Sequence, residues 1–264
     1  MWIGDKMKVF KDLYQYRELL KTNVKKEIRG KYKGSFLGVL WSFVNPLLMV
    51  LVYAIVFPYI MRVQQDNYLI FLIVAIIPWN FFTTVIAQGS ITVRTNGNII
   101  KKVYFPREIL PISVVVSGLV NFLISCLIIF IFLIGSGIGL SWYLLLLPVI
   151  AIIEFMLSLG IVFIVSSINI YVRDLEYIVN FIISLLFYAT PVLYNINMFE
   201  GSWIAKLLML NPMTHIINAY RDIMYYQTLP NMKYLSIVAF ASFIIMIIGY
   251  KIFKKLEKGF AEEV

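Results

Sequence analysis

Long apolar runs, separated by short charged segments, form the main pattern of this 264-residue chain. Charged residues are absent from five long windows, at positions 34–61, 67–93, 109–153, 177–199 and 234–250. A helix that spans a membrane needs about 20 mostly apolar residues, because the hydrocarbon core is about 30 Å thick. The pattern predicts an all-α membrane protein with six transmembrane helices, over residues 37–61, 68–92, 109–134, 142–170, 177–195 and 233–253.

Three further segments are predicted from local patterns. Residues 8–29 carry apolar positions at helical spacing between Lys and Glu, which indicates an amphipathic helix that lies in the membrane interface. Between the fifth and sixth spans we expect two short re-entrant helices, over 202–210 and 212–227, the second capped by Asn211 and opened by Pro212. Residues 254–264 form a tail, and the whole chain 1–264 is interpreted as one transmembrane domain.

The composition agrees with a membrane protein. Hydrophobic residues make up 61% of the chain and charged residues only 14%, with a mean hydropathy of +0.86. Soluble domains carry about 25% charged residues. The excess of apolar surface therefore requires lipid as a solvent.

The distribution of Lys and Arg predicts the orientation in the membrane. Of the 23 basic residues, 19 lie before the first predicted span, in the second and fourth connections, or after the last span. Because cytoplasmic segments are enriched in Lys and Arg, both termini and the connection 98–108 are predicted to be cytoplasmic. The net charge of +9 is explained by this asymmetry, and we expect no nucleic-acid partner.

No catalytic chemistry is indicated by the sequence. The chain has no phosphate-binding loop with a Gly-Lys-Ser/Thr ending, and no cluster of Cys and His. The lone Cys126 is interpreted as a packing residue, and the lone His215 as a structural hydrogen-bonding group rather than a ligand. Glu154, inside the fourth predicted span, is left open between a structural hydrogen bond and a role in a transport path. We expect no metal or cofactor in this chain.

Five motifs in order carry a resemblance to a known family. They are "RGKYKGSFLGVLWSFVNPLL" from Arg29, "IIKKVYFPREILP" from Ile99, "IYVRDLEYI", "YATPVLYN" and "LNPMTHIINAYRDI". The series resembles the six-span permeases of the type-2 ABC exporter family, in the branch that exports lipid-linked polysaccharides. Within this branch it looks most similar to wall teichoic acid translocation permeases, with O-antigen and capsule exporters as near relatives. The resemblance implies a bacterial plasma-membrane protein.

The resemblance also implies partners. Two permease chains and two copies of a separate ATPase subunit, which holds ATP and Mg, form the transporter in this family. The connection 98–108 offers apolar and charged side chains for docking on such a subunit, and the family also uses the fourth connection. The residues expected to couple the chain to the ATPase are Ile100, Lys101, Lys102, Tyr104, Phe105, Arg107, Glu108, Arg173 and Asp174.

A transport path and a lipid entrance are predicted as well. In the resembling exporters the first and fifth spans face the dimer axis, and aromatic rings on these spans provide flat faces for sugars. The expected path residues are Phe36, Phe43, Tyr53, Phe57, Phe181 and Tyr188, although helix packing alone also explains such rings. Lys25, Lys26 and Arg29 are expected near lipid head groups. An exporter of drugs or small lipids, a secondary transporter and a membrane scaffold remain as alternatives.

Overall fold

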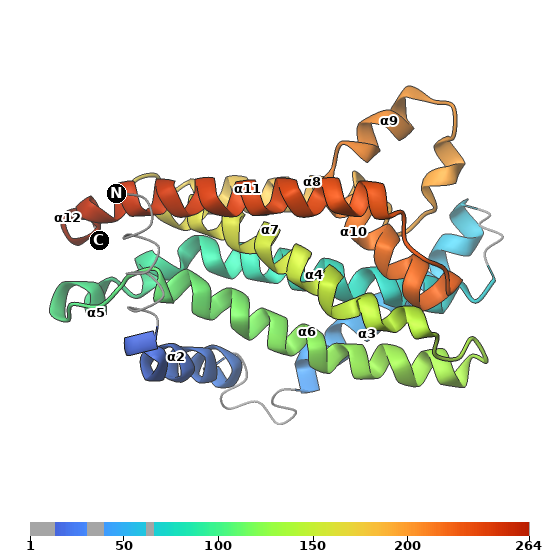
Figure 1. Cartoon of the computed structure of the whole chain (residues 1–264), viewed down its shortest axis with the longest axis horizontal. Coiled ribbons are helices and arrows are strands. Elements are labelled where there is room, and N and C mark those ends of the chain that lie inside the picture. The colour runs from blue at the N-terminus through green and yellow to red at the C-terminus, as the bar shows by residue number, and fades with distance from the viewer. Residues whose placement is uncertain (1–13, 31–39, 62–65, 264) are drawn as a thin grey trace.

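The protein is a bundle of helices elongated along one axis (Figure 1). The computed structural model describes residues 14–30, 40–61 and 66–263, and this part of the chain consists of helices and turns without a strand. The α-helices are α2 (Arg17–Gly30), α3 (Trp41–Met61), α4 (Tyr68–Thr95), α5 (Gly97–Lys102), α6 (Ile109–Gly135), α7 (Leu147–Ile168), α8 (Leu175–Tyr188), α9 (Trp203–Met209), α10 (Pro212–Arg221), α11 (Met232–Leu256) and α12 (Phe260–Glu263). The short turns are η2 (Trp142–Leu146), η3 (Ile196–Phe199) and η5 (Glu257–Gly259), with a π-helical turn at η4 (Asp222–Tyr226).

Four of the described helical segments are long and apolar enough to cross a membrane: Tyr68–Lys102, Ile109–Gly135, Trp142–Ile168 and Met232–Gly259. Their main helices α4, α6, α7 and α11 run along the long axis of the bundle (Figure 1) and pack on one another. Two further apolar stretches, Val44–Phe57 and Leu175–Tyr188, are shorter. The predicted all-helical membrane architecture is confirmed for the described residues, whereas the number of six spans stays a prediction.

A backbone contact between two glycines joins α7 to α11. A Cβ atom built at Gly249 would lie 2.2 Å from the carbonyl oxygen of Gly160, and one at Gly160 would lie 2.6 Å from the backbone nitrogen of Met246. Such close approach is possible only without side chains, and small residues are the usual means of packing helices in lipid. The two glycines therefore set the distance between α7 and α11.

Replacing Gly249 with Ala is expected to destabilise the protein, because the new methyl group must push two helix backbones apart. Overpacking of this kind costs about 1–3 kcal/mol, and thermal unfolding of the purified protein measures the loss. Gly135→Ala is the matched control, since a Cβ at Gly135 meets no atom within 4 Å. Equal melting temperatures for the two variants would contradict the assignment.

The helix α8 ends at Tyr188, earlier than the predicted end of the fifth span at residue 195. Pro191 explains the stop, because proline lacks a backbone N–H and disfavours helical geometry at the preceding residue. With 14 residues, α8 is about 21 Å long. Residues 190–194 continue as buried, non-helical chain.

Each backbone carbonyl from Tyr188 to Tyr194 accepts a hydrogen bond, mostly from a side chain. Arg221, which is 2% exposed, donates to the carbonyls of Pro191, Val192 (2.7 Å) and Tyr194 (3.3 Å). The remaining carbonyls are paired by Asn211 Nδ2, Tyr68 Oη, Tyr194 Oη and the backbone N–H of Val192. Buried non-helical backbone is tolerated in a membrane protein only when it is paired in this way.

The shorter predicted helices have counterparts in the structure. The helices α9 and α10 occupy the two predicted positions after the fifth span, and the side chain of Asn211 caps α10 by accepting from the N–H of Met213 (3.0 Å). The helix α2 covers the later part of the predicted amphipathic helix, whose residues 8–13 lie outside the described part of the chain. That α2 lies in the membrane interface, and that α9 and α10 are re-entrant, stay predictions.

The acidic residue inside α7 has a hydrogen-bonding partner. Glu154 is fully buried, and its Oε2 accepts a hydrogen bond of 2.9 Å from Tyr220 Oη on α10. This bond supplies the structural role that the sequence left open for Glu154, although Glu154 Oε1 has no partner among the described residues. Cys126 is buried with its thiol free, as expected of a packing residue.

Candidate functional site

The connection between α4 and α6 forms a short projecting unit at one end of the bundle (Figure 1). The helix α4 closes with Asn96, whose side-chain Nδ2 donates to the carbonyl of Thr92 (2.8 Å). The helix α5 then runs to Lys102, and Val103 is extended. Pro106 keeps the preceding Phe105 out of helical geometry, so the segment after Val103 stays non-helical. The result is one helical turn followed by an extended segment.

From position 98 to 104 most side chains of this unit are exposed, whereas two side chains between 98 and 105 point into the protein. Ile100 and Phe105 are buried and anchor the unit to the bundle. The exposed side chains, which we call the docking surface, are Ile99, Lys101, Lys102, Val103 and Tyr104. Tyr104 is 91% exposed, more than any other large apolar or aromatic side chain of the described residues. The docking surface therefore resembles one half of a protein–protein interface, with an aromatic centre among charges.

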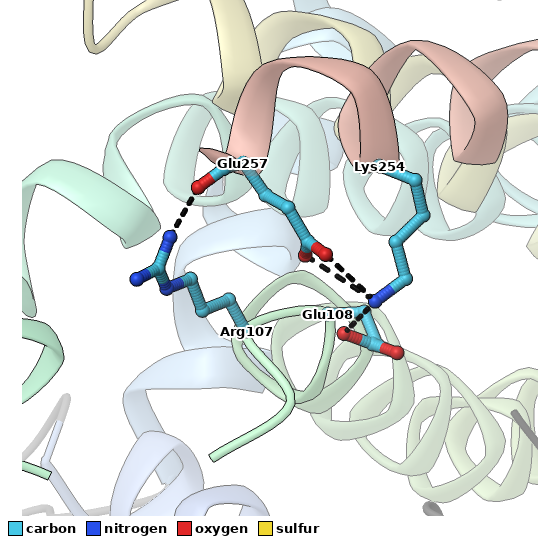
Figure 2. A network of polar contacts seen from close by, with 4 residues as sticks. All are labelled: Arg107, Glu108, Lys254 and Glu257. Carbon is cyan, nitrogen blue, oxygen red and sulfur yellow. Dashed lines mark hydrogen bonds and ion pairs between the residues drawn. The ribbon is translucent and has the colours of Figure 1, made fainter. Parts of the chain in front are cut away.

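A network of four residues fixes the end of this unit to the C-terminal part of α11 (Figure 2). Lys254 Nζ lies 2.9 Å from Glu108 Oε2 and 3.0 Å from Glu257 Oε1. Arg107 Nη1 donates to the backbone carbonyl of Glu257. Glu108 is 1% exposed, so removing Lys254 would leave a buried carboxylate without its counter-charge. The sequence predicted that Arg107 and Glu108 contact a partner, whereas their described bonds lie within the chain.

The connection between α7 and α8 packs against the same end of α11. Phe260 on α12 is fully buried against Phe253, with ring centroids 5.4 Å apart, and the guanidinium of Arg107 lies 5.9 Å from the Phe260 ring. Tyr171, which follows α7, donates from its hydroxyl to the carbonyl of Leu256 (2.8 Å). The end of α11 thus holds both connections at this end of the bundle.

A cleft of about 610 Å³ separates the docking surface from the start of α8. Arg94 Nη2 and Glu176 Oε2, 2.5 Å apart, lie on its wall and link the end of α4 to α8. Lys101, Arg173 and Asp174 also line the cleft, so the structure brings together predicted residues that are about 70 positions apart in the sequence. Arg173 and Asp174 are both exposed.

The predicted path residues divide into two groups. Tyr53 and Phe57 are partly buried, and the Tyr53 ring lies 6.0 Å from that of Phe187 on α8. By contrast, Phe181 and Tyr188 on α8 are 64% and 70% exposed. The structure therefore brings α3 into ring contact with α8 through Tyr53, and it leaves an aromatic face of α8 uncovered. Phe36 and the side chain of Phe43 lie outside the described part of the chain.

The predicted head-group residues lie on α2, which packs beside α6. Lys25 and Lys26 are exposed, and Lys26 Nζ donates to Asn96 Oδ1 (3.2 Å) at the end of α4. The side chain of Arg29 is not among those described. Lys26 thereby connects α2 to the same end of the bundle as the docking surface.

Sequence reasoning missed the residues that hold the docking surface in place. Lys254, Glu257 and Phe260 were interpreted only as a basic tail, and Arg94 only as a topology signal. The i,i+3 spacing of Lys254 and Glu257 is a local sign of an ordered helix end. The pairing of Lys254 with Glu108, 146 positions away, has no local signal. No group of three or more His, Cys, Asp or Glu suited to a metal ion occurs among the described residues.

Comparisons with known proteins agree over nearly the whole chain. The ABC-2 type transporter family matches residues 18–225. The O-antigen export system permease protein RfbA of Myxococcus xanthus is 35% identical over 259 residues, which cover 98% of this chain and all of that protein. Two RfbA proteins of Klebsiella pneumoniae are 38% and 39% identical over 249 residues, or 93% of this chain and 94% of each relative. A nearer likeness to wall teichoic acid permeases stays a prediction.

Proposed function

The chain belongs to the ABC-2 type transporter family, and on that premise we propose that it is the permease subunit of an exporter that moves a lipid-linked polysaccharide outward across the bacterial plasma membrane. The observation that carries the proposal is the full-length similarity to three O-antigen export permeases. The energy comes from a separate ATPase subunit, which holds ATP and Mg, because this chain has no phosphate-binding loop.

The ATPase subunit binds to the docking surface and to the neighbouring Arg173 and Asp174. The exposed ring of Tyr104 supplies the aromatic anchor that interface centres commonly contain. Lys101, Lys102 and Arg173 supply charges that fix the orientation of the partner. The buried side chains of Ile100, Phe105 and Glu108 do not contact the ATPase but hold the docking surface in place.

The end of α11 transmits movement of the docking surface into the bundle. Glu108 and Arg107 follow the docking surface in the chain, and both bond to the end of α11. The same helix packs along α7 through the Gly160–Gly249 contact. A displacement of the docking surface by ATP binding therefore shifts α11 as a rigid rod, because closely packed helices do not deform continuously.

A second copy of the chain completes the transport path. One copy offers half of a channel, and two-fold closure is the commonest form of assembly for identical chains. The aromatic face of α8, with Phe181 and Tyr188, is exposed in the single chain and suits both the partner copy and passing sugar rings. Tyr53 and Phe57 on α3 extend this wall, and Phe36 and Phe43 are assigned to it from the sequence alone.

Orientation and lipid contact follow from the charges. Both termini and the docking surface face the cytoplasm, in accord with the excess of Lys and Arg at that end. Lys25, Lys26 and Arg29 on α2 attract the phosphate groups of the lipid carrier to the entrance.

Deleting the gene for this chain is expected to abolish surface polysaccharide, and re-expression should restore it. The tagged permease should also co-purify from its native membrane with an ATPase subunit whose turnover rises when the lipid-linked polysaccharide is added. Stimulation by drugs or short-chain lipids instead would establish an exporter with the same fold and another cargo. A chain that co-purifies with no ATPase would contradict the proposal.

A further inference from the structure

A second cleft, of about 480 Å³, opens at the end of the bundle opposite to the docking surface. Four segments line it: the connection that follows α8, the end of α9, the helix α10 with its π-helical turn, and the start of α11. In Figure 1 α10 and the start of α11 lie at the end of the bundle away from α5 and α12. The volume falls within the range of about 300–1,000 Å³ that is typical of small-molecule sites. The mechanism described above assigns no role to this cleft.

Two polar side chains in the cleft have no partner among the described residues. Asn218 and Asp222 lie four positions apart and share one face, and both line the cleft. No hydrogen bond or ion pair within the described chain engages the amide of Asn218 or the carboxylate of Asp222. Partial burial raises the pKa of Asp222 to about 6, although the neighbouring Arg221 opposes this shift. The half-buried carboxylate and amide are therefore available to a ligand.

Aromatic rings form the rim of the same cleft. Tyr226 and Tyr234 line it and are about 40% exposed. The imidazole of His215 stacks on Tyr234 with ring centroids 4.9 Å apart, and Asn195 Nδ2 donates to Tyr226 Oη (2.9 Å). These contacts hold both rings in fixed orientations beside the free polar groups.

The backbone that carries Asp222 is unusual and firmly held. Asp222 opens the π-helical turn η4, a conformation that is rare and frequent at functional sites. The turn ends at Gln227, which has a left-handed conformation with φ of 54°. Gln227 Nε2 donates to the carbonyls of Ile138 (2.7 Å) and Gly139 (3.2 Å) in the connection after α6. The side-chain bonds of Gln227 thus hold the end of the π turn against the connection after α6.

We propose that this cleft is a glycan subsite that binds a neutral, hydroxyl-rich sugar unit of the polymer as it leaves the transport path. The inference rests on the proposed export of polysaccharide. Asp222 accepts hydrogen bonds from two neighbouring hydroxyls, and Asn218 both donates and accepts. Tyr226 and Tyr234 contact the apolar face of the sugar ring. A free carboxylate disfavours an anionic ligand, and the described residues offer no acidic cluster for a metal ion.

A binding experiment tests the subsite directly. The permease, assembled with its ATPase subunit in lipid nanodiscs, is titrated with short oligosaccharides cut from the surface polysaccharide of the source strain. The double variant Asn218→Leu, Asp222→Asn is expected to bind about tenfold more weakly or worse, because it loses hydrogen bonds to a charged acceptor and to an amide. Glu200→Gln is the matched control, since it removes an exposed carboxylate of the same segment outside the cleft. Unchanged affinity in the double variant would overturn the proposal.

Photolabelling of the unmodified protein tests the subsite without a variant that could misfold. An oligosaccharide that carries a photoreactive diazirine is expected to label peptides between residues 195 and 235. Labelling confined to other segments, or no labelling, would overturn the subsite even where the chain restores surface polysaccharide in the deletion strain. Failure to restore surface polysaccharide would instead contradict the proposed function, so the two failures are distinguishable.

Discussion

Replacing Arg221 with Met is expected to prevent stable folding of the chain in the membrane. The substitution leaves the carbonyls of Pro191, Val192 and Tyr194 without these donors inside the protein. Each unpaired buried polar group costs about 1–3 kcal/mol. Three such groups approach the total stability of a typical protein, about 5–15 kcal/mol. The guanidinium also lies 3.5 Å from the centroid of the Phe71 ring, and that cation–π contact is lost as well.

The amount of folded protein in the membrane measures this effect. Arg221→Lys should be nearly as harmful, because an ammonium group cannot reproduce the planar fork that reaches three carbonyls. Lys206→Met is the matched control, as it removes an exposed positive charge from the neighbouring helix α9. Normal membrane levels and normal melting of Arg221→Met would show that the segment 189–194 holds its shape without these bonds.

Local patterns in the sequence were sufficient to predict the main helices and the cap of one short helix. The apolar windows predicted α4, α6, α7 and α11, because lipid and the protein interior are both apolar, so such a run suits a helix that faces lipid as well as one that is mostly buried, as α4 is. The Asn211-Pro212 pair correctly predicted the start of α10, because capping depends on residues that are adjacent in the chain.

The sequence was a poorer guide to features that depend on distant residues. In the sequence Arg221 was interpreted only as an external positive charge. In the structure it is buried against the loop after α8, which lies about 30 positions earlier in the chain. The early end of α8 was missed although Pro191 marks it locally, because the apolar residues around this proline have the same composition as the end of a span. At the candidate site, the exposed Tyr104 and the buried Phe105 are adjacent and chemically alike, so only tertiary packing distinguishes them.

Truncating Tyr104 to Ala is expected to uncouple transport from ATP hydrolysis while leaving the permease folded. The side chain is 91% exposed, so the isolated chain loses almost no packing when the ring is removed. Truncation of an aromatic anchor at an interface costs about 2 kcal/mol or more, which corresponds to roughly a 30-fold loss of affinity. Phe105→Ala should act differently, by loosening the buried side of the same unit and lowering its thermal stability.

The affinity between the purified permease in nanodiscs and its ATPase subunit separates these effects. Tyr104→Ala should melt like the unmodified protein, bind the ATPase weakly and restore little surface polysaccharide in a deletion strain. Tyr104→Phe should retain most of the binding, because it keeps the ring. Tyr143→Ala, at the other end of the bundle, is the matched control and should leave binding unchanged. Wild-type affinity of Tyr104→Ala would place the ATPase elsewhere, with the cleft beside Arg173 and Asp174 as the next surface to test.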